Sequence, residues 1–152
     1  MKIIAGGQTG VDRAALDFSV EHEIDYGGWC PRGRRAEDGT IPPHYRLRET
    51  ATDEYSERTE RNVLDSDATL VITRELPLLG GTLATVEFCR KHGKPVLVVS
   101  EHEGDTKAAL EVIEFLKENR VAILNVAGPR ESEAPGLGEF VRRVLYASLQ
   151  KG

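Results

Sequence analysis

The chain alternates short apolar runs with longer stretches of helical periodicity, and this alternation limits the fold more than any other feature. The apolar runs are rich in Val, Ile and Leu and are too short for typical helices, which favours strands. We predict strands over residues 2–5, 26–30, 68–73, 96–99 and 121–126. Most of these runs do not alternate between apolar and polar residues, as expected for strands that are covered on both faces of a sheet.

Between the predicted strands, apolar residues recur at helical spacing. Val11, Ala14, Ala15 and Phe18 form one such stripe and predict a helix over residues 10–22. Similar patterns predict helices over 53–65, over 80–93, around 109–116 and around 137–148. Strands that alternate with helices of this length imply βαβ units. The fold class predicted is therefore α/β, a Rossmann-like doubly wound, mostly parallel sheet of about five strands with helices on both faces.

The length of the chain and its charge narrow the possibilities further. Its 152 residues show no internal repeat or linker, so we expect a single Rossmann-like domain over 1–152. The 20 Lys and Arg residues against 25 Asp and Glu residues give a net charge of −5. This balance disfavours a nucleic-acid or membrane-surface binder, because such proteins carry a basic footprint. No apolar stretch is long enough to span a membrane and the chain starts without a leader pattern, so we expect a cytoplasmic protein.

Two glycine-rich junctions lead from predicted strands into helices. The first covers residues 6–13 and the second covers residues 79–87. Glycine lets a ligand approach the backbone, and the N-terminus of the following helix favours a phosphate or another anion. Neither junction matches a dinucleotide-binding or Walker A fingerprint. The candidate ligand-binding residues at the junctions are Gly6, Gly7, Gln8, Thr9, Gly10, Asp12, Arg13, Gly80, Gly81 and Thr82.

The predicted topology places the two junctions together. With right-handed crossovers, the first strand can lie beside the 68–73 strand, with their helices on opposite faces. Ligands of doubly wound sheets bind at such a switch point, outside the carboxyl ends of the strands. Two alternatives remain open: Thr9 and Asp12 form a capping box for their own helix, and Gly80-Gly81 is a plain tight turn.

Arginine is unevenly distributed along the chain. Seven of the 14 Arg residues fall between positions 30 and 61, where there is no Lys. Arg32, Arg34 and Arg35 follow the second predicted strand, and their planar guanidinium groups suit phosphate or carboxylate. The same segment holds seven acidic residues, so ion pairing within the segment is the competing interpretation.

Cysteine and histidine give no sign of a metal site. Cys30 and Cys89 match no metal or redox spacing, and the four His residues form no ligand pair. We therefore expect two reduced, buried thiols and no protein-bound metal.

Five motifs together resemble a known family. They are GGQTGVDRAALD at 6–17, GWCPRGRRAEDG at 28–39, LRET at 47–50, RTExNVxDSDAT at 58–69 and GGT at 80–82, where x marks a position outside the motif. They resemble the putative molybdenum carrier family over nearly the whole chain. This family is similar in fold to molybdenum cofactor carrier proteins and to the cytokinin-activating phosphoribohydrolases. The resemblance implies a Rossmann-like homo-oligomer that carries molybdenum cofactor (molybdopterin) or a related phosphate-bearing, nucleotide-like ligand.

One departure from the phosphoribohydrolases bears on catalysis. Their Pro-Gly-Gly-x-Gly-Thr-x-x-Glu motif keeps its glycine pair and its glutamate here, as Gly80, Gly81 and Glu87. Leu79 replaces the proline, and Leu83-Ala84 replaces the second Gly-Thr. The leading hypothesis is therefore a binding protein for a small phosphate-bearing ligand. The alternative is a nucleoside monophosphate phosphoribohydrolase with Glu87 as its catalytic carboxylate, and a third hypothesis is a ligand sensor.

Overall fold

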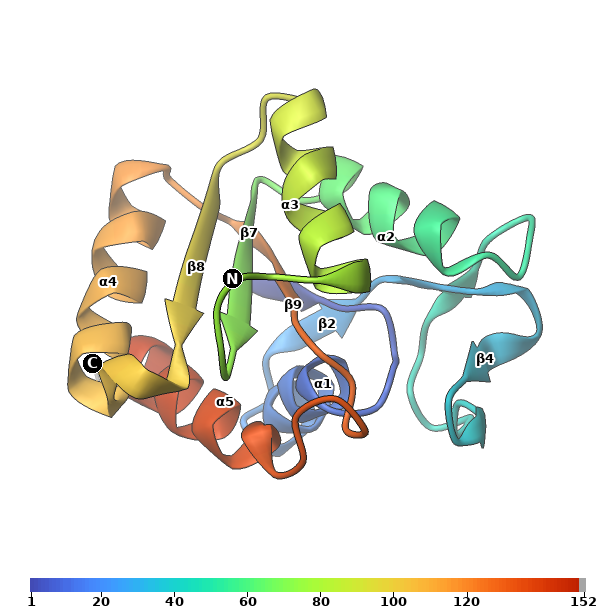
Figure 1. Ribbon diagram of the computed structural model, residues 1–152, viewed down its shortest axis with the longest axis horizontal. Coiled ribbons are helices and arrows are strands. Elements are labelled where there is room, and N and C mark those ends of the chain that lie inside the picture. Colours follow the sequence, from blue (N-terminus) through green and yellow to red (C-terminus); the bar gives the residue numbers. More distant parts are fainter. Residues whose placement is uncertain (151–152) are drawn as a thin grey trace.

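Five parallel strands form the central sheet of the computed structural model, which describes residues 1–150. The strands of this sheet are β1 (Lys2–Ile4), β2 (Asp25–Gly27), β7 (Ala68–Thr73), β8 (Val96–Ser100) and β9 (Ile123–Ala127). The helices are α1 (Val11–Glu21), α2 (Tyr55–Leu64), α3 (Gly80–Lys91), α4 (Asp105–Glu118) and α5 (Leu137–Leu145). This arrangement confirms the predicted α/β, Rossmann-like fold with helices on both faces (Figure 1).

The strand order differs from the one expected in one respect. The order across the sheet is β2-β1-β9-β7-β8, so the last strand of the chain lies between β1 and β7. The prediction that the first strand lies directly beside the 68–73 strand is wrong, because it did not allow for a late strand that inserts between them. The start of β9 is held by Asp67, whose carboxylate accepts hydrogen bonds from the backbone N–H groups of Ala122 and Ile123 at 2.9 and 2.8 Å.

With β9 in this position, the sheet has the strand order of a known fold class. If β9 is counted as the first strand, followed by β1, β2, β7 and β8, the order across the sheet becomes 3-2-1-4-5. This is the order of doubly wound nucleotide-binding sheets. The switch point of such a sheet lies between its first and fourth strands, which here are β9 and β7.

The helices divide between the two faces of the sheet. On one face α5 packs against both α1 and α4, and on the other α2 packs against α3 (Figure 1). The helices that follow the two glycine junctions, α1 and α3, therefore lie on opposite faces, as predicted.

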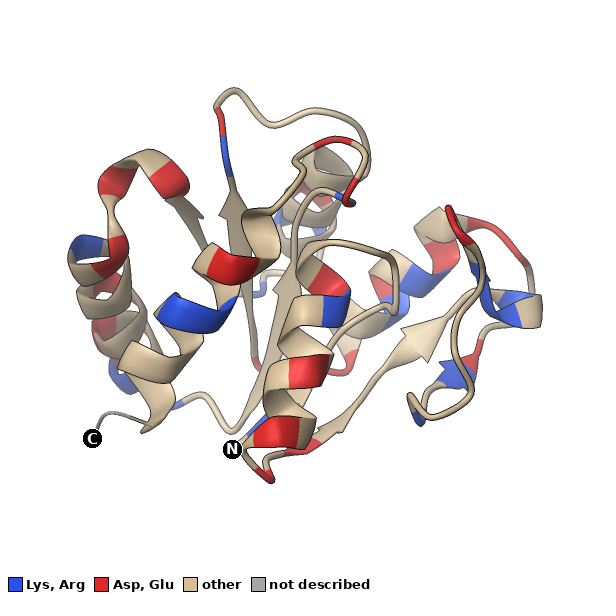
Figure 2. Ribbon diagram, turned by 90° about the horizontal axis from the view of Figure 1, so that it is seen from below, with Lys and Arg blue, Asp and Glu red and all other residues tan. Residues whose placement is uncertain are grey.

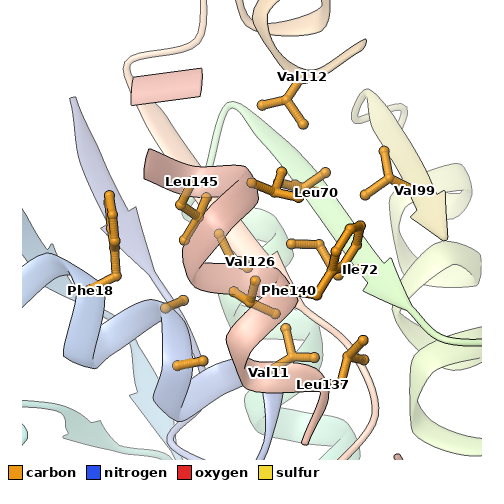
Figure 3. Packing of buried hydrophobic residues seen from close by; sticks show 14 of the residues in the cluster. Val11, Phe18, Leu70, Ile72, Val99, Val112, Val126, Leu137, Phe140 and Leu145 are labelled. Atoms are coloured by element: carbon orange, nitrogen blue, oxygen red, sulfur yellow. The ribbon is translucent and has the colours of Figure 1, made fainter. Parts of the chain in front are cut away.

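Most of the hydrophobic core lies under α5. Phe140, Leu137 and Leu145 of this helix point toward the sheet and are buried, next to Ile72 and Val126 (Figure 3). A smaller cluster packs the loop that follows β2 against α1. It contains the buried residues Ala5, Leu16, Cys30, Ala36, Ile41 and Tyr45.

Residues 28–50 form short paired strands outside the central sheet. Gly28 ends β2, since its φ is +129° and a side chain there would meet the Ala5 carbonyl oxygen at 2.3 Å. Two short ladders follow, β3 (Trp29–Cys30) with β6 (Arg48–Glu49) and β4 (Arg35–Ala36) with β5 (Gly39–Thr40). The expected strand over 26–30 is thus split in two, and the residues that follow it contain further short paired strands.

Charged residues of both signs are spread along the ribbon (Figure 2). Among the described helices, none is both long enough and apolar enough to cross a membrane.

Replacing Asp67 by Ala tests how β9 is held. The two backbone hydrogen bonds lower the pKa of the Asp67 carboxyl, so its contribution to stability is present above the pKa of an unfolded Asp, 3.8, and is lost as pH falls through the lower folded value. We expect Asp67→Ala to reduce the free energy of unfolding by about 1 kcal/mol at neutral pH, and by less at low pH. Denaturant titration at several pH values measures this.

The control is Asp53→Ala, because Asp53 is exposed and its side chain makes no hydrogen bond within residues 1–150. Two outcomes would contradict the role of Asp67 in holding β9. One is that both substitutions lower the free energy of unfolding equally, and the other is that the loss in Asp67→Ala does not change with pH.

Candidate functional site

A cavity of about 390 Å³ opens at the carboxyl ends of the central strands, at the switch point between β9 and β7. Its volume lies within the range of small-molecule sites, about 300–1,000 Å³. The lining residues come from both glycine junctions, from α2 and α3, and from β9 with the segment that follows it. They are Gly6, Gln8, Asp12, Tyr55, Ser56, Arg58, Thr59, Asn62, Gly80, Gly81, Thr82, Ala84, Thr85, Asn125, Val126, Ala127, Gly128, Arg130 and Glu133. The two junctions therefore line one cavity, although β9 separates their strands.

The second junction leaves the N-terminus of α3 open. Leu79 is the N-cap residue and gives no side-chain hydrogen bond to the first turn of the helix. A Cβ at Gly80 or Gly81 would have no atom within 4 Å, so both glycines face free space. The backbone N–H groups of the first helical turn, together with the helix dipole, are thus available to an anion in the cavity.

The first junction is filled by the protein itself. A Cβ at Gly6 would lie 2.0 Å from Nη1 of Arg58, and a Cβ at Gly10 would lie 2.6 Å from the Pro129 carbonyl oxygen. The start of α1 is also occupied, because the Val11 N–H donates to that same carbonyl at 3.3 Å. Gly6 and Gly10 are therefore explained by close packing within the protein. Gly80 has a φ of +55°, which favours glycine in the turn before α3, whereas neither packing nor backbone conformation requires glycine at position 81.

A buried ion pair forms one wall of the cavity. Nη1 of Arg58 donates to Oδ2 of Asp12 at 3.1 Å, and the two side chains are only 10% and 7% exposed. Nε of Arg58 donates to the Tyr55 carbonyl at 3.3 Å, which leaves Nη2 with no hydrogen bond within the described residues. Burial raises the pKa of the Asp12 carboxyl, and Arg58 offsets part of this effect. The same carboxylate accepts a hydrogen bond from the Gln8 N–H at 3.2 Å. No side chain caps α1, so Thr9 and Asp12 do not form the capping box that the sequence left open.

The segment after β9 contributes a second guanidinium group that the sequence analysis did not single out. Nε of Arg130 lies 3.6 Å from Glu37 and 3.5 Å from Glu133, but it is buried and makes no hydrogen bond within residues 1–150. The signal was available, because Gly128 and Arg130 follow the carboxyl end of a predicted strand, as both glycine junctions do.

Two buried amides complete the lining. Nδ2 of Asn125 donates to Oγ1 of Thr69 at 3.2 Å, and its Oδ1 has no partner among the described residues. Asn62 accepts from the Trp29 N–H at 2.8 Å and donates to the Trp29 carbonyl at 3.0 Å, which holds α2 against β3. Asn62 belongs to one of the family motifs, but the sequence assigned it no role. Amides of this kind can hydrogen-bond the polar edge of a ring system.

The predicted arginines lie outside the cavity lining. Arg13 forms a bidentate pair with Asp38, at 2.5 and 2.8 Å. Arg34 donates to the carbonyl oxygens of Ile41, Pro42 and Tyr45, and so braces its own loop. The Arg35 guanidinium lies 4.2 Å from the centre of the Tyr55 ring, at the edge of the site, and Arg32 is exposed.

The predicted residues Gln8 and Thr9 join the arginine-rich loop to the segment after β9. The Gln8 carbonyl oxygen Oε1 accepts from the Glu37 N–H at 2.9 Å, while the Thr9 hydroxyl donates to the Glu37 carboxylate. Ser132 donates to the same carboxylate through its hydroxyl, at 2.5 Å, and through its backbone N–H. These hydrogen bonds, from Ser132 and then from Thr9, hold the pKa of Glu37 below its usual range.

Glu87 and the cysteines do not contribute to the lining. Glu87 is exposed on α3, and Cys30 and Cys89 are free and buried elsewhere. Burial raises the pKa of both thiols. The described residues contain no group of three or more His, Cys, Asp or Glu residues that could hold a metal ion.

Comparisons with known proteins agree with this architecture. Residues 3–149 match the family described as the circularly permutated YpsA SLOG family. A solved structure, titled a putative molybdenum carrier protein from Syntrophus aciditrophicus SB, is 44% identical in sequence. The match covers 97% of this chain and 94% of that one, with a TM-score of 0.95. The strand order agrees with the description of a permuted chain, because β9, last in sequence, occupies the place of a first strand.

Replacing Arg58 by Met tests the buried pair. The Asp12 carboxylate would then be buried without its cation, and we expect a loss of about 3–5 kcal/mol in the free energy of unfolding at neutral pH. The pKa of the Asp12 carboxyl is raised by folding, and a group of this kind lowers the free energy of unfolding as pH rises. Without its cation this effect grows, so Arg58→Met should become more stable toward low pH. Denaturant titration against pH measures both effects.

Adding Asp12→Asn to this variant should restore most of the loss. Arg90→Met serves as the control, because Arg90 is exposed and its side chain forms no ion pair within the described part of the chain. A double variant as unstable as Arg58→Met alone would contradict the assigned role of the carboxylate.

Proposed function

Because the chain belongs to the circularly permutated YpsA SLOG family, we propose that it binds and carries a small phosphate-bearing ligand in the cavity between β9 and β7. The observation that carries this proposal is the open N-terminus of α3, which faces the same cavity as Arg58 and Arg130. Nothing in the described chain occupies the N–H groups that a phosphate would use.

The charged side chains of the lining balance, with Arg58 and Arg130 against Asp12 and Glu133, so the place for an anion is the open N-terminus of α3. The backbone N–H groups at Gly80–Thr82 would bind phosphate oxygens directly, since no side chain blocks them. Arg130, which lies 3.6 Å from Glu37 and 3.5 Å from Glu133, would turn its guanidinium group toward the phosphate. Arg58 would offer Nη2, which makes no hydrogen bond within residues 1–150. Asn125 would orient the remainder of the ligand through its Oδ1.

Molybdenum cofactor is the candidate cargo. The proposal draws on the name of the 44% identical solved structure and on the phosphate group that this cofactor carries. The lining fits the phosphate end, because its free donors are guanidinium and backbone N–H groups. It offers no thiol to the metal, so the molybdenum would arrive on the dithiolene of its own pterin.

The hydrolase alternative finds no support in the site. It depends on Glu87 as a carboxylate facing the ligand, and Glu87 is exposed outside the cavity lining. The proposal is therefore a carrier, which we place in the cytoplasm as a homo-oligomer on the strength of the family resemblance.

Gly81→Asp tests the phosphate site. The new carboxylate would sit in the first turn of α3, where it is compatible with the helix dipole but repels a bound phosphate. We expect at least about tenfold weaker binding of adenosine 5′-monophosphate and inorganic phosphate, with the thermal midpoint of the free protein unchanged or raised. Calorimetry and thermal-shift measurements report the two quantities.

Gly81→Ala is the matched control, since its Cβ enters free space without a charge. It should keep the wild-type affinity. Binding that Gly81→Asp leaves unchanged would refute the assignment of the site.

The cargo itself is tested on protein purified from cells replete with molybdenum. We expect molybdenum and pterin fluorescence to accompany the wild-type chain in equal amounts and to be lost from Gly81→Asp. Elemental analysis and fluorescence of the denatured extract measure them. Wild-type protein that binds phosphate compounds but carries no molybdenum or pterin would retain the phosphate site and overturn the proposed cargo.

A further inference from the structure

Most arginines of the arginine-rich segment have no carboxylate partner within the described residues. Among the seven Arg residues between positions 30 and 61, only Arg58 pairs with a carboxylate within the described residues, and its partner Asp12 lies outside the segment. Acids of the segment pair with cations elsewhere, as Asp38 does with Arg13 and Glu60 with Lys91. Ion pairing within the segment, the competing interpretation, therefore does not occur in the described structure.

Several of these arginines are held on aromatic rings instead. The Arg48 and Arg61 guanidinium groups lie 5.6 and 4.3 Å from the centre of the Trp29 ring, and Arg46 lies 5.4 Å from that of Tyr26. Arg48 is the register partner of Trp29 across the β3–β6 ladder. Stacking restricts these long side chains, which lowers the cost of binding an anion. Nε of Arg46 donates to the Tyr26 hydroxyl at 3.5 Å, and the other guanidinium donors of Arg46, Arg48 and Arg61 make no hydrogen bond within the described residues.

Arg46 and Arg48 line a hollow of about 340 Å³ together with Lys2. This hollow shares no lining residue with the cavity at the switch point. The Lys2 side chain lies along Gly27, where a Cβ would be 3.7 Å from its Nζ. The one carboxylate in the lining, Asp65, accepts a hydrogen bond from Nε1 of Trp29 at 2.6 Å.

We infer that this hollow, which we call the Trp29 hollow, is a second binding site, and that it takes a small phosphate compound with two or more negative charges. Three cations, none of which pairs with a carboxylate within the described residues, outnumber the single carboxylate of the lining, Asp65, by two. An anion with only one negative charge would therefore leave positive charge unneutralised. The guanidinium forks of Arg46 and Arg48 suit phosphate oxygens, and the volume suits a small molecule rather than a macromolecule. The inference does not depend on the proposed carrier function.

The test uses the fluorescence of Trp29, which is the single Trp of the chain and lies in the lining. Inorganic tripolyphosphate is titrated at low ionic strength, with potassium chloride at matched ionic strength as the reference. We expect a saturable change in the wild type and at least about tenfold weaker binding in Arg48→Gln, which removes a charged fork. A linear response, equal to that of potassium chloride, would overturn the inference.

Matched variants locate the effect. Arg32→Gln removes an exposed arginine of the same segment outside the hollow, and Gly81→Asp changes the other cavity. Both should keep the wild-type response, which separates this site from the carrier site. A loss in Arg32→Gln as large as that in Arg48→Gln would show diffuse charge attraction and overturn the inference. So would saturable binding of an Asp- and Glu-rich peptide without saturable binding of tripolyphosphate, which would indicate a protein partner.

Discussion

The insertion of β9 between β1 and β7 is the constraint on which the rest of the structure depends. It gives the sheet a doubly wound order and sets the switch point between β9 and β7. It also brings Asn125 and Arg130 to the edge where α3 begins. The last helix, α5, then packs under the inserted strand and supplies much of the core (Figure 3). A chain without this insertion would leave both glycine junctions without the third segment of the cavity.

The site follows from how the donors around this switch point are used. The first junction has little room for a ligand, because the Arg58 side chain covers Gly6. At the start of α1 the Val11 N–H already donates to the Pro129 carbonyl oxygen. The second junction has open glycines and no cap. The buried pair of Asp12 and Arg58 forms a wall of the cavity, and its net charge is close to zero. The attraction for an anion therefore comes mainly from the N-terminus of α3, because the charge of Arg130 is offset by Glu37 and Glu133.

The sequence was sufficient for the fold class but not for the strand order. Apolar runs identify the strands, yet pairing between β1 and β9 joins residues more than 100 positions apart, and no local pattern encodes it. The glycine junctions were found because glycine at a strand end is a local signal, whereas Arg58 and Asn62 lie on a polar helix whose pattern resembles a solvated one. The ion pairs of the arginine-rich segment could not be predicted from its composition. Composition does not show whether the acids of the segment pair with its own arginines or with cations elsewhere, which in the structure are Arg13, Lys91 and Arg130.

A crystal structure with bound inorganic phosphate is the most direct test of the central claim that the switch point holds a phosphate. The account predicts a phosphate within hydrogen-bond distance of the backbone N–H groups at Gly80–Thr82, with the Arg130 guanidinium turned toward it. A saturated crystal with phosphate bound elsewhere and none at the start of α3 would contradict the account.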